Sequence, residues 1–534
     1  MEEICRKHHL LTEERGVVRV PFLVKGRLVL PPEMGREEVE SAFSEQDRDT
    51  RYLKLPQAQL IREPIIDREA VQVTPEYLYQ VMPPLNPLDL VEADIDRLVS
   101  GPYDLKVDDL VAFAQAIGDG LEQDWATVER VRQLCGRTME HPGLYLDGAF
   151  AALRSGFDLQ TARRMIDREL AIWNLPGSQF LEGWVEVPAE VLPGLVPLLA
   201  QSLGGGGQVP NLPARPTALR AMPTRQLHIT AGNAPEVPMV SALRLILSKS
   251  AGVIKLPFGS TLPGAMLGLA AIATVPDHPL TQNLSIVYWQ GGDEHIENVL
   301  FAPGAFDRIV VWGAPGAVTS VQARALFTKV VSFNPRYGVS LIGREAFGVD
   351  LQQVAFLAAM DTMIYSQKSC TASLVHYVEG SMEQVQAYGR HLLEILGQWD
   401  KVAPPFPLPA VRGQLKRMRR GRYARASWQT NTRNGEHTSA IVITPDEFDI
   451  LDHPLSRLVV IRPVEDLNNV LAYLHAGVST AGVYPESRRM ALRDRIAARG
   501  VSNVLPLGQC ERIVPGAPHD GMMVLSELVD WKTA

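Results

Sequence analysis

The stretch YSQKSCTASLVHYVEG, from Tyr365 to Gly380, places a cysteine among small and hydroxyl-bearing residues just before an apolar run. Cys370 is a candidate nucleophile, because a thiolate at such a position can attack a carbonyl carbon. A lone cysteine is more often a small buried residue, so residues elsewhere in the chain must decide between the two interpretations. Cys5, Cys135 and Cys510 form no CxxC pair, and we interpret them as bystanders rather than as a disulfide or metal site.

Three loops upstream of this cysteine carry residues that suit ligand binding. TAGNAPEVP contains Asn233, whose amide can donate hydrogen bonds into a cleft, and KLPFGSTLP contains Lys255. WGAPGAV brings Gly313 to where a backbone can approach a phosphate. Neither GxGxxG nor GxxxxGK[ST] occurs, so the usual dinucleotide and P-loop fingerprints are absent. Each loop alone is weak evidence, since turn glycines and surface lysines are common.

The elements that position these loops are typical of an α/β protein. From residue 225 to residue 326, short apolar strands alternate with helices of about ten residues, which predicts a parallel sheet covered on both faces. A second series follows Cys370, with SAIVIT and RLVVIRPV as strands. In open parallel sheets, ligands bind beyond the carboxyl ends of the strands, where these loops lie.

Composition narrows the class of protein. The chain has 534 residues, a hydrophobic content of 46% and a net charge of −8, which favours several folded domains and no nucleic-acid-binding surface. The basic run at residues 412–425 is interpreted as a solvated face, with a phosphate-facing patch as the less favoured alternative. No apolar run reaches about 18 residues, so no membrane span is predicted. The N-terminus has no apolar signal region, so we expect a reducing, cytoplasmic location.

The order of these motifs resembles the aldehyde dehydrogenase superfamily: Gly-Asn-x-Pro, a lysine 22 residues later, FDRIVVWGAPGAV and then SQKSC. More narrowly, GAPHDGMMVLSELVDW and SRLVVIRPVEDL are similar to the LuxC-type acyl-CoA reductases, the fatty acid reductases of bacterial bioluminescence. The resemblance covers about residues 225–531. It implies an aldehyde-dehydrogenase-like α/β fold, with a Rossmann-type cofactor lobe, an α/β catalytic lobe and a helical N-terminal region.

The resemblance also implies site residues. Cys370 matches the catalytic nucleophile and Asn233 the amide of the oxyanion hole. The other matches line a cofactor groove: Thr230, Lys255 and Pro257 on two loops, with Gly313 and Ala314 near the diphosphate. His376, six residues past the cysteine, is interpreted as a core histidine rather than a proton donor. His519 is a candidate acid or a turn-stabilising residue, and Asp452 is assigned no role.

The implied activity is NADPH-dependent reduction of an acyl-CoA, or another acyl thioester, to the aldehyde through an acyl-cysteine. The segment VSFNPRYGVSLIG has no carboxylate where hydrolytic relatives carry a glutamate, so an acyl-enzyme should survive until hydride arrives. Phe258 stands where NAD-preferring enzymes often have a glutamate, which favours NADPH. The alternatives are an oxidative NAD(P)-dependent aldehyde dehydrogenase or a non-catalytic subunit of an acyl-transfer complex. An acyl-protein synthetase partner and a homo-oligomer are also implied.

Five segments are expected. They are a β-rich lead-in (1–85), a helical part (86–215), a Rossmann-type NADP(H)-binding domain (216–335), a catalytic domain with the nucleophilic cysteine (336–500), and a C-terminal segment returning to the domain junction (501–534). LGGGGQVPNLPARPTALRAMP, residues 203–223, is predicted to be a flexible break.

Overall fold

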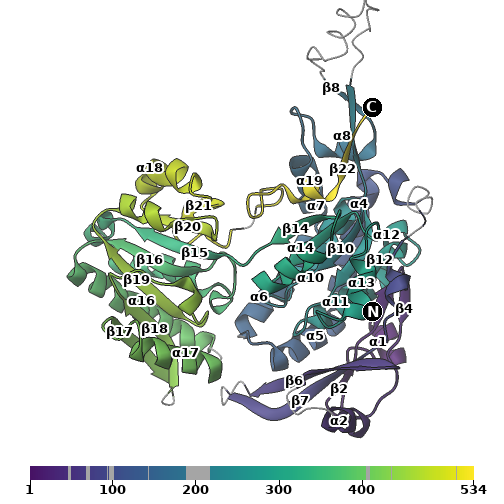
Figure 1. Cartoon of the computed structure of the whole chain (residues 1–534), viewed down its shortest axis with the longest axis horizontal. Coiled ribbons are helices and arrows are strands. Elements are labelled where there is room, and N and C mark those ends of the chain that lie inside the picture. Colours follow the sequence, from purple (N-terminus) through teal and green to yellow (C-terminus); the bar gives the residue numbers. More distant parts are fainter. Residues whose placement is uncertain are drawn as a thin grey trace, which may run out of the picture.

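A computed structural model describes the chain except for residues 46–49, 68–71, 93, 95–100, 142, 188–216, 405–408, 434–435 and 513. Figure 1 shows two lobes that meet at a narrow junction. Residues 337–506 build the smaller lobe, and the chain before and after them builds the larger one. The two lobes have separate hydrophobic cores, so each is a packing unit of its own.

The larger lobe is organised around a sheet with the strand order β14-β13-β10-β11-β12-β3-β4. Strands β10 to β14 are parallel, and their apolar runs are buried by helices between them. The helices and strands are β10 (Arg225–Ile229), α10 (Val237–Leu247), β11 (Ala251–Lys255), α11 (Thr261–Thr274), α12 (Pro279–Gln282), β12 (Leu284–Val287), α13 (Glu294–Leu300), β13 (Arg308–Trp312), α14 (Pro315–Arg324) and β14 (Lys329–Phe333).

The N-terminal third completes this lobe. The hairpin of β3 and β4 extends the sheet, because Leu23 pairs antiparallel with Ile286 of β12. A second sheet has the order β1-β2-β7-β6-β5. The elements are α1 (Glu2–His8), β1 (Glu13–Glu14), β2 (Val17–Arg19), β3 (Phe22–Val24), β4 (Arg27–Val29), α2 (Arg36–Ser44), β5 (Tyr52–Leu55), β6 (Ala58–Asp67), β7 (Gln72–Met82), η1 (Pro87–Leu90) and η2 (Pro102–Asp104).

Five helices follow, and they share one hydrophobic core with helices α10 and α11 of the parallel sheet. In α4, Leu110, Phe113, Ala114 and Ile117 are buried, as the helical periodicity of this stretch predicts. The helices are α4 (Val107–Gln123), α5 (Trp125–Thr138), α6 (Gly143–Gly156), α7 (Leu159–Glu169) and α8 (Gly177–Glu182), and β8 (Val185–Val187) comes after them. The helical part is therefore packed onto the larger lobe instead of forming a separate body.

The smaller lobe contains a seven-stranded sheet with the order β17-β18-β19-β16-β15-β20-β21. Only β17 runs antiparallel to its neighbour. The elements are β15 (Tyr337–Ile342), η3 (Arg344–Gly348), α15 (Leu351–Met363), η4 (Ile364–Gln367), β16 (Ser373–Glu379), α16 (Met382–Val402), α17 (Pro409–Arg420), β17 (Ser427–Arg433), β18 (Glu436–Ile443), η5 (Ile450–Asp452), β19 (Leu458–Val464), η6 (Leu467–Tyr473), β20 (Val478–Tyr484), α18 (Glu486–Ala497) and β21 (Asn503–Pro506).

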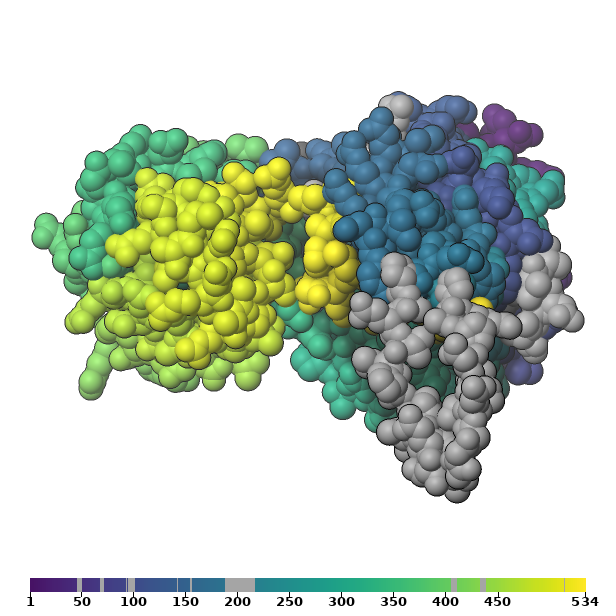
Figure 2. Space-filling model, turned by 90° about the horizontal axis from the view of Figure 1, so that it is seen from above, coloured from purple at the N-terminus to yellow at the C-terminus, as the bar shows by residue number. Residues whose placement is uncertain are grey.

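The chain crosses between the lobes twice. Residues 334–336 lead from β14 to β15, and residues 507–523 return from β21 to α19 (Val524–Leu528) and β22 (Asp530–Thr533). Figure 2 shows this yellow C-terminal segment at the surface between the lobes. β22 pairs with β9 (Thr217–Met222), which pairs with β8. Residues 217–222 are thus a strand and not part of a flexible break, and residues 203–216 lie outside the described residues. Among the helices described, none is long and apolar enough to cross a bilayer.

Candidate active site

Cys370 lies in a turn between η4 and β16, at the amino-terminal edge of the smaller lobe's sheet. The three residues Tyr365, Ser366 and Gln367 have φ values of 46°, 51° and 70°. Consecutive non-glycine residues in this left-handed region are strained, so the surrounding structure must hold them. We call residues 364–370 the nucleophile loop.

A buried arginine holds this loop from the side of the smaller lobe. Arg457 is fully buried, and its Nε and one terminal nitrogen donate to Ser366 Oγ at 3.3 and 3.2 Å. Its other terminal nitrogen donates to Asp400 Oδ1 at 2.5 Å. Next in the chain, Gln367 Nε2 donates to the Leu458 carbonyl at 2.7 Å. These bonds satisfy polar groups that would otherwise be costly to bury, and they fix the backbone before the cysteine.

The larger lobe holds the same loop through the residues around Asn233. The Asn233 amide donates to the Lys368 carbonyl at 3.3 Å, two residues before the cysteine. Three residues after Asn233, Glu236 accepts a hydrogen bond from the Tyr365 hydroxyl at 2.6 Å. The structure therefore brings Asn233 and the nucleophile loop together across the junction. Glu236 has no signal in the sequence, because its partner lies 129 positions away.

The helical N-terminal part also reaches the site. His141 is 2% exposed, and its Nε2 lies 2.7 Å from the Asn233 backbone oxygen. The His141 ring also packs edge-on against Tyr365, with a centroid distance of 5.1 Å. Lys368 forms an ion pair with Glu140 at 2.5 Å. Residues 140 and 141 thus contact both sides of the candidate site, a role that helical periodicity could not reveal.

The environment of the Cys370 thiol opposes ionisation. Burial is the main cause, and with the negative charge of Asp520 it raises the pKa of Cys370 to about 11, against a smaller opposing effect from Arg336. The thiol is therefore protonated at neutral pH. A nucleophilic role then requires a proton acceptor during attack.

Arg336, Arg244 and the C-terminal segment form the charged surroundings of the candidate site. Arg336 Nε lies 3.8 Å from Asp520 Oδ2, and Arg244 donates to His519 Nδ1 at 2.9 Å. Burial lowers the pKa of Arg244 to about 10, and burial with the nearby arginines lowers that of His519 to about 3. The segment with Asn334 and Arg336 indeed supplies no carboxylate. The structure instead brings Asp520 from the other crossing, which the sequence interpretation missed.

An aromatic pair closes the site toward the larger lobe. The rings of Trp312 and Phe333 stack with a centroid distance of 3.8 Å and an interplanar angle of 13°. Arg244 lies over both rings, at 5.5 and 5.4 Å from their centroids, and His519 meets the Trp312 ring edge-on. These aromatic residues end strands β13 and β14, so the stack borders the carboxyl edge of the cofactor-side sheet, where ligands bind.

The predicted cofactor residues lie along that same edge. Thr230 donates to the Lys255 carbonyl at 2.6 Å, which joins the ends of β10 and β11. Lys255 is 7% exposed, its Nζ lies 5.3 Å from the Trp289 ring centroid, and burial lowers its pKa to about 8. Pro257 is buried beside Gly232, where an added Cβ would lie 2.6 Å from the Phe258 carbonyl oxygen. The two loops are thus packed against each other.

Gly313 and Ala314 precede helix α14, and Ala314 is its N-cap without a side-chain cap bond. A Cβ added to Gly316, within the first turn, would have no other atom within 4 Å, so this helix start is open. A helix N-terminus with free N–H groups suits an anionic diphosphate. The described residues therefore fit a dinucleotide laid from Lys255 to the start of α14. They contain no cluster of three or more His, Cys, Asp or Glu that could hold a metal ion.

The other residues considered from the sequence, His376, Asp452 and the remaining cysteines, make contacts that indicate structural roles. His376 is fully buried and bonded to Thr362 Oγ1 at 3.0 Å and to the Tyr388 hydroxyl at 2.8 Å, and burial lowers its pKa to about 3. It is a core histidine, as the sequence interpretation favoured. Asp452 accepts from the Tyr423 hydroxyl at 3.2 Å, beside helix α17. The other cysteines are buried in packing.

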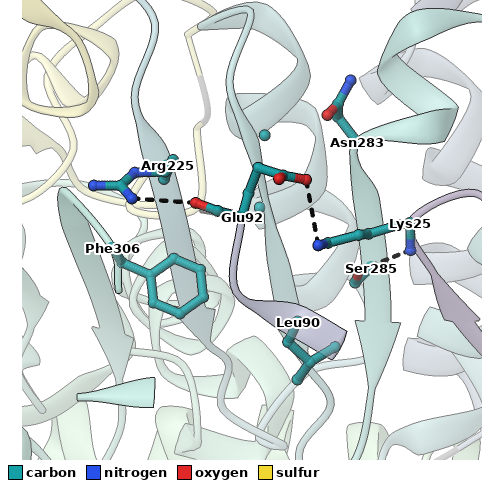
Figure 3. A pocket seen from close by; sticks show the side chains of 9 residues that line it. Lys25, Leu90, Glu92, Arg225, Asn283, Ser285 and Phe306 are labelled. Carbon is teal, nitrogen blue, oxygen red and sulfur yellow. Dashed lines mark hydrogen bonds and ion pairs between the residues drawn. The ribbon is translucent and has the colours of Figure 1, made fainter. Parts of the chain in front are cut away.

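A separate cavity lies at the opposite edge of the cofactor-side sheet (Figure 3). It has room for about one water molecule, and residues at the starts of β10, β11 and β12 line it. Lys25 Nζ pairs there with Glu92 Oε2 at 3.3 Å, and Arg225 donates to the Glu92 backbone oxygen at 3.2 Å. Its charges are paired with one another, so it belongs to the packing of the N-terminal hairpin.

Comparison with known proteins gives a family match. The profile of the family described as acyl-CoA reductase (LuxC) matches residues 216–531. The long-chain acyl-protein thioester reductase of Photorhabdus laumondii is 26% identical over 328 residues, which are 60% of this chain and 66% of that protein. The protein of the same name from Vibrio harveyi is 24% identical over 332 residues, covering 60% and 66%. The chain thus spans just under two thirds of these relatives.

Solved structures resemble the whole chain. Aldehyde dehydrogenase 21 from Physcomitrella patens superposes with a TM-score of 0.67 at 11% identity, covering 96% of this chain and 97% of that one. An NADP-dependent glyceraldehyde-3-phosphate dehydrogenase from Bacillus halodurans, complexed with NADP, superposes with a TM-score of 0.64 at 13% identity, covering 96% and 98%. These likenesses confirm the predicted two-lobed α/β fold.

Proposed function

This chain belongs to the LuxC family of acyl-CoA reductases, and from that premise we propose that it reduces an acyl thioester to the aldehyde through an acyl group on Cys370. The substrate is an acyl-CoA or an acyl-protein thioester, and the cofactor is NADPH. Residues 216–335 bind the cofactor and residues 336–500 carry the nucleophile. The observation that carries this proposal is the contact of the Asn233 amide with the nucleophile loop at the lobe junction.

In the proposed reaction, Cys370 Sγ attacks the thioester carbonyl carbon and a tetrahedral oxyanion forms. The Asn233 amide and the Cys370 backbone N–H are the donors that stabilise it. The Asn233 amide is held at 3.3 Å from the Lys368 carbonyl, a long bond that an oxyanion can replace. Loss of the thiol leaving group then leaves the acyl-enzyme. A bound reduced nicotinamide supplies the hydride that brings this acyl group to the aldehyde level.

Lys255, Thr230 and Pro257 would hold the adenosine end of the cofactor, and Gly313 and Ala314 the diphosphate. Phe258 is 39% exposed beside this groove. Because it puts no carboxylate near the ribose, it creates no repulsion against a 2′-phosphate. This supports NADPH over NADH. Lys255 adds a buried cation whose charge is not neutralised by a salt bridge among the described residues, which favours an anionic ligand.

The second candidate function is oxidative aldehyde dehydrogenase activity, and one observation supports it. The negative charge of Asp520 raises the pKa of the Cys370 thiol, so a carboxylate acts on the site although the β14–β15 segment supplies none. The preference for reduction over oxidation therefore rests on the family match. The lack of a glutamate in the β14–β15 segment is not sufficient support for it, because Asp520 supplies another carboxylate. We also propose that the protein is cytoplasmic, forms homo-oligomers and receives its acyl group from an acyl-protein synthetase. A non-catalytic role in such a complex is the alternative if no thioester is reduced.

The deciding experiment measures NADPH oxidation and aldehyde formation with acyl-CoAs of different chain length and shape. We expect thioester-dependent turnover and, without NADPH, an acyl adduct on Cys370 in the intact mass. Cys370→Ala should lose both. Cys5→Ala is the matched control, because Cys5 is a buried thiol of helix α1 in the core of the larger lobe. Full turnover in Cys370→Ala would overturn the proposal.

A further inference from the structure

Two loops face each other at the lobe junction, the nucleophile loop of the smaller lobe and the loop between β10 and α10 of the larger lobe. The Asn233 amide donates to the Lys368 carbonyl at 3.3 Å. Three residues further along one loop and three residues back along the other, Glu236 accepts from the Tyr365 hydroxyl at 2.6 Å. The two contacts thus pair the loops in opposite chain directions and define one register between them.

The two contacts differ in strength and in what the reaction requires of them. An amide–carbonyl bond of 3.3 Å is long, whereas 2.6 Å is in the short range for a hydroxyl bound to a carboxylate. In the proposed reaction the Asn233 amide leaves the Lys368 carbonyl in order to donate to the oxyanion. Among the described residues, the bond from Tyr365 to Glu236 is then the hydrogen bond that still joins the two loops.

The ring of Tyr365 is also held by the larger lobe. His141 packs edge-on against it at a centroid distance of 5.1 Å, and the Tyr145 ring lies at 5.7 Å. His141 Nε2 lies 2.7 Å from the Asn233 backbone oxygen, so the same histidine contacts both loops. Tyr365 has a φ of 46°, a strained value for a non-glycine residue, and these contacts from the other lobe help to maintain it.

The Glu236 side chain does not serve the helix that it precedes. Glu236 is the N-cap residue of α10, but its side chain makes no cap bond to the first turn. The carboxylate is partly buried and its Oε1 is bonded across the junction instead. Burial raises the pKa of Glu236, while the bond from Tyr365 lowers it, so this bond offsets part of the cost of burying the charge.

We propose that Glu236 and Tyr365 are positioning residues for the acylation of Cys370. Their hydrogen bond keeps the two loops in register when the Asn233 amide leaves the Lys368 carbonyl for the oxyanion. This inference rests on the proposed function. Both residues act through the placement of Asn233 relative to Cys370, and not by bonding to the substrate. The carboxylate of one lobe and the hydroxyl of the other thus set the geometry of the oxyanion hole.

This role predicts different effects on two reactions of the Cys370 thiol. Acylation by a thioester forms an oxyanion and therefore depends on the Asn233 amide. Alkylation by iodoacetamide displaces iodide from a saturated carbon, forms no oxyanion and does not need that amide. An error in the register of the two loops should slow acylation alone, whereas a displaced or more deeply buried thiol should react more slowly with both reagents.

The test compares full-length variants in these two reactions. Tyr365→Phe keeps the ring and removes the hydroxyl, Glu236→Leu removes the acceptor, and Glu236→Gln keeps an oxygen that can accept the bond. Tyr423→Phe is the matched control, since its hydroxyl also bonds a carboxylate, that of Asp452, within the smaller lobe. Each protein is mixed with octanoyl-CoA or hexadecanoyl-CoA without NADPH, and acyl-Cys370 formation is followed by quenched mass spectrometry. Alkylation of Cys370 by iodoacetamide at pH 8 is measured in parallel.

We expect Tyr365→Phe and Glu236→Leu to slow acylation by about 10-fold and to leave alkylation within about twofold of the wild-type rate. Glu236→Gln should be acylated at close to the wild-type rate, and Tyr423→Phe should change neither reaction. In an Asn233→Ala background, Tyr365→Phe should slow acylation by less than about twofold further, because the amide that it positions is gone.

Equal loss of both rates in Tyr365→Phe would show a displaced thiol and overturn the proposal, as would an unchanged acylation rate. A 10-fold loss of acylation that persists in the Asn233→Ala background would also contradict it. Failure of Glu236→Gln to retain acylation would show that the hydrogen bond is not what matters. If the wild-type protein forms no adduct on Cys370 with either thioester, the proposed function itself fails, which is a different result.

Discussion

At the scale of single residues, burial keeps the Cys370 thiol protonated at neutral pH and makes the Lys255 ammonium more acidic than usual. The pKa of Cys370 is raised to about 11 and that of Lys255 is lowered to about 8. Neither value could be predicted from the sequence, because each depends on neighbours far away in the chain. The sequence selected Asn233, Lys255 and Cys370 as candidates, since each belongs to a recognisable motif beside a strand, and the structure brings Asn233 into contact with the loop before Cys370.

The raised pKa of Cys370 predicts how the rate of its alkylation depends on pH. The reactive form is the thiolate, so the rate of Cys370 modification by iodoacetamide in the free protein should keep rising from pH 7 to about pH 10 without a plateau. Peptide mapping after short exposures measures this rate at each pH. A plateau near pH 7 would mean that the thiol is already ionised there, contrary to its burial beside Asp520.

The lowered pKa of Lys255 predicts how the affinity for NADPH depends on pH. The amine is protonated below about pH 8 and neutral above it, while a phosphate is largely ionised over that range. NADPH should therefore bind less tightly to the free protein as the pH rises from 7 to 9. In Lys255→Met, binding should be about 10-fold weaker at pH 7 and nearly independent of pH. Fluorescence titration measures the affinity of each protein for NADPH at each pH. If the affinities of the wild-type protein and Lys255→Met change with pH in the same way, Lys255 does not bind the cofactor phosphate.

At the scale of elements, the alternation of strands and helices from β10 to α14 follows directly from local apolar periodicity, and the structure has these elements where the pattern predicts them. The nucleophile loop is different. Its left-handed residues Tyr365, Ser366 and Gln367 carry no glycine signal, so the turn depends on contacts from residues 236, 457 and 458. Contacts across about 90 or more positions leave no local pattern.

Loss of the buried arginine should therefore weaken the smaller lobe. Arg457→Met leaves Asp400 buried without its partner, and we expect a loss of about 3–5 kcal/mol in the free energy of unfolding. The double variant Arg457→Met/Asp400→Leu should recover most of it, because no charge then remains buried. Urea unfolding followed by tryptophan fluorescence measures these changes. Arg493→Met, at an exposed pair with Asp494, is the control and should unfold at the wild-type midpoint.

At the scale of the whole molecule, the N-terminal third and the C-terminal tail are both parts of the larger lobe. The β3–β4 hairpin pairs with β12, and α19 packs its buried Val524, Leu525 and Leu528 into the same core. The sequence predicted the strands and helices of the N-terminal part without showing where they pack. Antiparallel pairing across some 260 positions, as for Leu23 and Ile286, has no local signal.

The C-terminal helix should therefore be needed for the stability of the larger lobe. We expect Leu525→Ala to lower the free energy of unfolding by about 2–5 kcal/mol, because it opens a cavity in the shared core. Met523→Ala, at a residue that is 40% exposed two positions earlier, should have a much smaller effect. Thermal unfolding of both variants measures this difference. Similar losses for the two would mean that α19 is not part of this core.

The two crossings between the lobes carry opposite charges. Arg336 lies on the first crossing and Asp520 on the second, 3.8 Å apart, so the tethers touch beside the nucleophile. Asp520 raises the pKa of the Cys370 thiol and Arg336 lowers it, so both tethers act on the charge of the same sulfur atom. Any change in the separation of the two tethers would therefore change how readily this thiol ionises.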